Sequence, residues 1–152
     1  DIGEPFSGLK VLDSGDTIVA AQLVASDLKT LQKNAGLLNQ RLSLLVGRRE
    51  FEEFPGDLLT DESQHATNTL AELAKMCEQK GELKPELYKS LERSASRLDR
   101  VANKLFEFER GRSELVKTYV DPLRRAAEKL SKDLRKAASN LFKFEKRMRG
   151  TG

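Results

Sequence analysis

Residues suited to catalysis or metal binding are scarce in this 152-residue chain, which contains no tryptophan, one histidine and one cysteine. A single imidazole without a cluster of cysteines or carboxylates does not form a zinc site, so we expect His65 to be a solvated surface residue. Cys77 falls among regularly spaced apolar residues, which predicts a buried structural thiol rather than an activated nucleophile. We therefore expect a non-enzyme with no cofactor, no metal and no small-molecule substrate.

Disulfides and long hydrophobic runs are also missing. One cysteine cannot form an internal disulfide, and this usage suits a reducing compartment, so we expect a cytoplasmic protein. The longest charge-free apolar stretch covers residues 17–26. It is shorter than the about 20 residues that a membrane-spanning helix needs. Any association with membranes is therefore expected to be peripheral.

Charged residues, by contrast, are abundant, at 34% of the chain against 38% hydrophobic residues. Such a composition, rich in Ala, Leu, Glu, Lys and Arg, favours long helices. The length suits one domain that buries a core without disulfides or metals. We predict an all-α fold, an antiparallel helical bundle with coiled-coil-like packing, as a single domain over residues 17–149.

The first 16 residues differ from the rest because glycine, proline and aspartate are frequent among them. This composition predicts no regular element, and we expect a loose leader over residues 1–16. The alternative is a short amphipathic wedge that docks on the bundle or on a membrane. Its apolar side chains are Phe6, Leu9, Val11 and Leu12.

Apolar spacing predicts helices over residues 17–48, 61–80, 85–120 and 122–148. Asp61 and Gln64 fit a capping box at the start of the second helix, and the preceding Pro-Gly pair is expected to form a turn. Phe51 and Phe54 either cap the end of the core or form an exposed hook for a partner. The first helix carries an unbroken apolar stripe that must face other helices, its own or a partner's: Ala21, Val24, Leu28, Leu31, Ala35, Leu38, Leu42 and Leu45.

Pro122 interrupts the longest apolar repeat, which runs from Leu91 to Tyr119 with Gly111 as only a soft interruption. Proline inside a helix costs on the order of 3 kcal/mol and clashes with the carbonyl four residues earlier. We expect the helix to kink or end at residues 119–121. Two outcomes remain open, either one long kinked C-terminal helix or two helices, the second of which is capped by Asp121.

Positive charge is concentrated in the second half of the chain, since residues 1–84 carry a net charge of −5 and residues 85–152 one of +8. After Pro122, the apolar residues fall along one edge of a helix and the cations in an arc of about 160° opposite. This arc is the candidate site for a membrane or protein partner: Arg124, Arg125, Lys129, Lys132, Arg135, Lys136, Lys143, Lys146, Arg147 and Arg149.

Three surroundings are open to this basic arc: solvent, an anionic membrane or a negatively charged macromolecule. Each Lys or Arg close to anionic lipid contributes roughly 1 kcal/mol. Nucleic acid is disfavoured because the arc lacks the clustered Asn, Gln and aromatic residues that read or stack on bases. The sorted charge therefore favours an anionic phospholipid membrane.

A resemblance to a known family lies in the stretch FEFERGRSELVKTYVDPLRRAAEKLSKDLRKAASNLFKFEKRM, which covers roughly a third of the chain. It resembles the long second helix of the BAR superfamily of membrane-curvature proteins, including its IMD branch. The resemblance implies a kinked antiparallel helical dimer whose basic face contacts anionic lipid, with Arg135, Lys136, Lys143 and Lys146 facing the membrane. The residues that carry it are Val120, Asp121, Pro122, Leu123, Asp133, Leu134, Arg135, Lys136, Phe144, Glu145 and Lys146.

Two functions from different classes follow from these patterns. The first is a non-catalytic helical scaffold or adaptor module that self-associates, or binds a helical protein partner, and contacts anionic membranes through its basic helix face. The second is a compact four-helix bundle of a signalling or adhesion adaptor, which binds protein partners and does not bind lipid.

Overall fold

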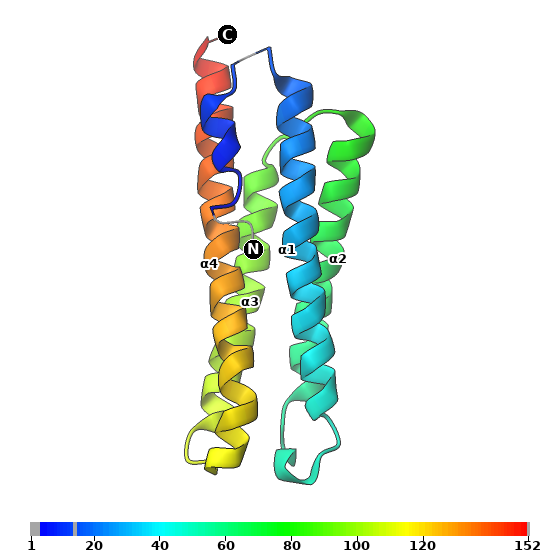
Figure 1. The fold of residues 1–152 in the computed structure, drawn as a ribbon, viewed down its shortest axis with the longest axis vertical. Coiled ribbons are helices and arrows are strands. Elements are labelled where there is room, and N and C mark those ends of the chain that lie inside the picture. Colours follow the sequence, from blue (N-terminus) through cyan, green and yellow to red (C-terminus); the bar gives the residue numbers. More distant parts are fainter. Residues whose placement is uncertain (1–3, 14, 152) are drawn as a thin grey trace.

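The chain folds into four antiparallel α-helices in a computed structural model that describes residues 4–13 and 15–151. The helices are α1 (Thr17–Leu45), α2 (Gly56–Lys80), α3 (Leu87–Glu109) and α4 (Glu114–Thr151), with short 3-10 turns η1 (Ser7–Val11) and η2 (Arg49–Phe51). Figure 1 shows them running alternately up and down as one long bundle. No strand occurs among the described residues. The predicted all-α helical bundle is confirmed.

The bundle consists of two helical hairpins that pack side by side. α1 lies along α2 and α3 lies along α4, and the contacts of α2 with α3 and of α1 with α4 close the ring (Figure 1). All eight residues of the predicted stripe on α1 are buried, and they face helices of their own chain. A stripe buried in this way no longer requires a partner helix.

The reversal between α3 and α4 lies at Gly111, not at Pro122. Gly111 has a φ of +73°, a left-handed conformation that glycine adopts without the strain of a Cβ atom. Pro122 lies inside α4 as its ninth residue. Both predictions for this region, a division into residues 85–120 and 122–148 or one continuous rod, are therefore wrong.

Exposure explains how α4 tolerates its proline. Pro122 is on the solvent side of the helix, and so is Thr118, whose carbonyl lacks the usual amide donor four residues later. Because the chain restarts at Glu114, the apolar face of α4 does not continue the repeat of α3. Leu115 and Tyr119, predicted to lie on the stripe, are 51% and 41% exposed, while Val116 and Val120 are buried instead.

The connection between α1 and α2 also differs from its prediction in detail. α1 ends at Leu45, and α2 begins at Gly56 with Pro55 as its N-cap residue, so Asp61 lies inside the helix and does not cap it. Phe51 and Phe54 do cap the end of the core, as predicted. Their rings pack against Phe108 and, for Phe51, Tyr119, at centroid distances between 5.0 and 6.1 Å.

The leader is ordered in its described part and docks on the bundle. η1 covers residues 7–11, where the sequence predicted no regular element. Phe6 and Leu9 are buried and Leu12 is half-buried, whereas Val11 is 83% exposed. The predicted alternative, a wedge that docks on the bundle, therefore describes residues 4–13 better than a loose leader does. Residues 1–3 and 14 of the predicted leader lie outside the described residues.

Candidate functional site

The apolar edge of α4 fixes the direction of its basic face. Six of the eight apolar residues that the spacing places on this edge are buried in the core, and the other two, Ala126 and Met148, are half-buried beside it. The six buried residues are Leu123, Leu130, Leu134, Ala137, Leu141 and Phe144. The cations of the predicted arc are consequently distributed around the remaining surface of α4. Their neighbours divide them into three groups.

The first group faces α3 and is engaged in ion pairs. The Arg124 guanidinium donates to Glu109 at 2.8 Å, to Glu128 at 2.8 Å and to Asp121 at 3.2 Å. Arg135 donates to Asp99 of α3, which also accepts a hydrogen bond from Ser131. These two arginines join α3 to α4, so their charge is partly neutralised within the protein.

Burial and charge shape the carboxylates of this network. Burial raises the pKa of Glu109, and the adjacent Asp121 raises it further, while Arg124 opposes both effects. The neighbouring Glu109 carboxyl and a hydrogen bond from Arg124 lower the pKa of Asp121. Helical spacing does not predict this cluster, because Glu109 and Arg124 face each other across the turn at Gly111, whereas the sequence predicts the break near Pro122.

The second group contains Arg147 and Lys129. The Arg147 guanidinium donates to the backbone carbonyls of Leu9 at 2.6 Å, Lys10 at 3.0 Å and Leu12 at 2.9 Å, and so holds the leader on α4. Lys129 forms an ion pair with Asp133, one turn later, at 3.0 Å.

The third group faces outward and forms what we call the basic ridge: Arg125, Lys132, Lys136 and Lys143. Their spacings of seven, four and seven residues place them within about 40° of one line along the helix, over a length of about 27 Å. All four are exposed, and none forms an ion pair or hydrogen bond with the part of the chain that the structure describes. Lys146 and Arg149, also exposed, extend the positive charge toward the end of α4.

His65 and Cys77 have the exposure that the sequence predicts for each. His65 is exposed on α2, and its ring lies 3.5 Å from the Thr69 hydroxyl. Cys77 is a buried free thiol. Across residues 4–13 and 15–151, no group of three or more His, Cys, Asp and Glu side chains is arranged to hold a metal ion.

Cys77 should react slowly with thiol reagents. Burial, together with the neighbouring Glu78, raises the pKa of the thiol, so the reactive thiolate is disfavoured. We expect modification by a disulfide reagent at pH 8 to be on the order of a hundredfold slower in the native protein than in denaturant. Stopped-flow absorbance measures both rates. Equal rates would show that Cys77 is accessible in the native state.

Comparisons with known proteins identify no relative of this chain. Among the described helices, none combines the length and apolar character required to cross a lipid bilayer. No protein family matches the chain, no curated protein matches it, and no solved structure matches it.

Proposed function

We propose that this protein is a non-catalytic helical module that binds anionic phospholipid membranes peripherally through the basic ridge of α4. One observation carries the proposal: the four ridge cations lie in line on one helix, are exposed, and form no ion pair or hydrogen bond with the described residues. The resemblance to the BAR superfamily implies the same kind of surface. Self-association stays part of the proposal, but it would have to use the outside of the bundle because the stripe on α1 is internal.

The charges support a weak, salt-sensitive attachment. At roughly 1 kcal/mol for each cation near an anionic surface, the four ridge residues together contribute about 4 kcal/mol. The attraction decays within a Debye length of about 8 Å at physiological salt. Binding should therefore require anionic lipid and weaken steadily as salt is added.

Charge reversal on the ridge tests this proposal. In a variant with Lys132→Glu, Lys136→Glu and Lys143→Glu, we expect co-sedimentation with phosphatidylserine-containing vesicles to weaken by roughly a hundredfold or more, because three attractive charges become repulsive. The matched control carries Lys33→Glu, Lys75→Glu and Lys80→Glu, three exposed lysines on α1 and α2. It has the same net charge as the ridge variant and should retain most of the binding.

The control variant distinguishes binding through the basic ridge from binding through the net charge of the protein. Circular dichroism should show that both variants remain helical. Equal loss in the two variants would assign binding to total charge, and no binding by the parent protein would refute the proposal. Only the second result, no binding by the parent protein, would favour the second function, a compact four-helix interaction module without lipid binding. That module is supported by a core that closes within one chain.

A further inference from the structure

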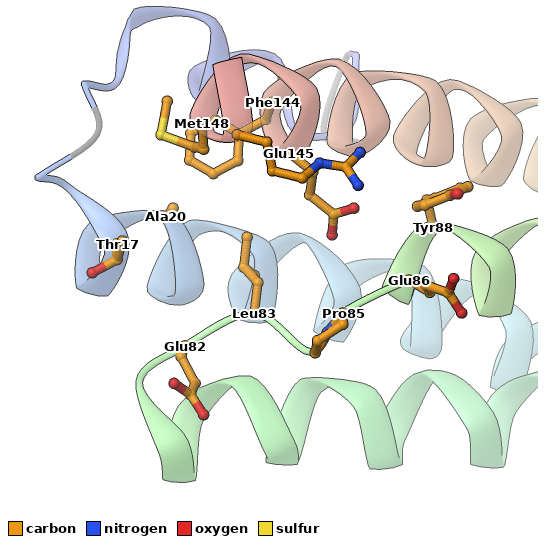
Figure 2. A pocket seen from close by; sticks show the side chains of 11 residues that line it. Thr17, Ala20, Glu82, Leu83, Pro85, Glu86, Tyr88, Phe144, Glu145 and Met148 are labelled. Carbon is orange, nitrogen blue, oxygen red and sulfur yellow. The ribbon is translucent and has the colours of Figure 1, made fainter. Parts of the chain in front are cut away.

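A cavity of about 600 Å³ lies at the end of the bundle where α1 begins and α4 ends. Its walls come from the first turn of α1, the α2–α3 connection, the start of α3 and the last turns of α4, as Figure 2 shows. Ala20, Leu83, Pro85, Phe144 and Met148 provide an apolar lining, and Tyr88 closes one side. We call it the end cavity. Its size falls within the range of small-molecule sites, roughly 300 to 1,000 Å³.

Glu145 gives the end cavity a charge. Figure 2 shows its carboxylate extending from α4 toward the Leu83–Pro85 segment, across the space that the apolar side chains enclose. Partial burial raises the pKa of this carboxyl, an effect that Glu86 reinforces and Arg149 opposes. Within the described residues, Glu145 forms no ion pair. A carboxylate in this position is incompletely compensated.

The other charged groups around the cavity leave a negative balance. Glu82 and Glu86 lie on the α2–α3 connection, and Glu86 is paired with Lys89 at 2.9 Å. Arg149 is the one cation among the lining residues. With Glu86 paired to Lys89, the acids Glu82 and Glu145 remain against the single base Arg149, and this balance of one negative charge favours a positively charged occupant over a neutral or negative one.

We propose that the end cavity binds a small organic cation, an amine that carries an apolar body, with its nitrogen beside Glu145 and its body against Phe144, Leu83 and Pro85. The ammonium group of the amine can donate charge-assisted hydrogen bonds to this carboxylate, and such bonds are about twice as strong as neutral ones. The apolar body displaces water from the lining. The ridge of α4 takes no part in this site.

Three matched probes separate the charge of the ligand from its shape: 4-phenylbutylamine, 4-phenylbutanol and 4-phenylbutyrate. Binding is followed by titration in two-dimensional amide NMR spectra of the full chain. We expect the amine to shift amides around residues 17–20, 82–88 and 144–149, and to bind about tenfold tighter than the alcohol. The carboxylic acid should bind more weakly than the alcohol.

Two lining variants have opposite expected effects. Glu145→Gln should reduce the affinity for the amine about tenfold and leave that for the alcohol nearly unchanged. Arg149→Gln should raise the affinity for the amine a few fold because it removes a competing cation. As a matched control, Glu72→Gln alters an exposed acid of α2 outside the lining and should have no effect.

If the charge variants fold poorly, a variant that fills the end cavity still tests the proposal. Thr17 is exposed at the rim of the cavity, and Thr17→Phe should reduce binding of both amine and alcohol. Equal affinity for all three probes, shifts outside the cavity, or unchanged amine binding by Glu145→Gln would each overturn the proposal. Lys132→Glu should bind the amine like the parent protein, which distinguishes this site from the lipid-binding ridge.

Discussion

Replacing Arg124 with alanine is expected to lower the free energy of unfolding by about 3 to 5 kcal/mol, because it leaves a buried carboxylate without its cation. The side chain of Glu109 is 8% exposed, and its Oε1 accepts a hydrogen bond from Arg124 Nε at 2.8 Å. Its Oε2 is buried and has no hydrogen-bond partner. Arg124 also bridges Asp121 and Glu128. Its removal therefore disturbs three carboxylates at once.

Urea denaturation followed by circular dichroism measures this loss. Arg125→Ala is the matched control, since Arg125 is the next residue, is exposed and forms no ion pair or hydrogen bond with the described chain; its cost should stay within about 0.5 kcal/mol. The double variant Glu109→Leu and Arg124→Leu should recover most of the lost stability, because no unpaired charge remains. A loss below about 1 kcal/mol in Arg124→Ala would show that the pair contributes little.

The Arg124→Ala variant should lose less stability, relative to the parent protein, in acid than at neutral pH. A carboxyl whose pKa is raised on folding binds more protons in the native state, so its contribution to stability decreases as pH rises through the window above its ordinary pKa. Glu109 is such a group, and Arg124 opposes its shift. In Arg124→Ala the pKa of Glu109 should rise further, so the deficit relative to the parent should shrink from pH 7 toward pH 4.5.

Asp121 has the opposite linkage. The neighbouring Glu109 carboxyl and a hydrogen bond from Arg124 lower the pKa of Asp121 in the folded protein. Its contribution to stability is therefore present above its ordinary pKa and is lost as pH falls further into the acid range. A pH series of stability measurements distinguishes the two carboxyls. The effect of Glu109 on stability appears above the ordinary carboxyl pKa, and that of Asp121 appears below it.

The helical stripes were predictable because helix periodicity depends on local spacing alone. The eight apolar residues of α1 repeat every three or four positions, and all are buried. The apolar edge of α4 follows the same rule from Leu123 to Phe144. These two stripes determine the all-α class and the direction of the basic face. Periodicity alone predicts no further feature of the fold.

The hairpin between α3 and α4 was not predictable from local penalties. Proline carries a larger cost inside a helix than glycine does, and this ranking placed the break near Pro122 rather than at Gly111. Antiparallel packing reverses the outcome, because a turn at Gly111 brings α4 alongside α3 and buries Val116 and Val120. Tertiary burial outweighs the loss of one hydrogen bond on the solvent side of the helix.

The division of the basic arc also depended on tertiary structure. A helical projection gives the angle of each cation around α4 but contains no information about acids on other elements. Asp99 and Glu109 of α3 engage Arg135 and Arg124, and the carbonyls of the leader engage Arg147. The ridge cations share one line along the exposed side of α4 and form no ion pair with the described residues of other elements.

The second large effect is expected at the leader, where replacing Phe6 with alanine should undock residues 4–13. Phe6 is fully buried, and truncation of a buried phenylalanine typically costs about 3 to 5 kcal/mol. Polar contacts assist the docking. The backbone N–H of Phe6 donates to Asp27 Oδ2 at 2.8 Å, and the buried amide of Asn140 donates to the Pro5 carbonyl at 2.8 Å.

The loss of stability in Phe6→Ala should appear in the leader before it affects the helical bundle. The Leu9 amide donates to the Phe6 carbonyl within the leader, and Phe6→Ala should reduce its protection from hydrogen exchange by at least about a hundredfold. Helix content should stay constant because α1 to α4 keep their own core. Val11→Ala is the control: Val11 is 83% exposed, so its loss should leave exchange at Leu9 unchanged. Unaltered protection of the Leu9 amide in Phe6→Ala would show that the contacts of Arg147 and Asn140 hold the leader without the Phe6 ring.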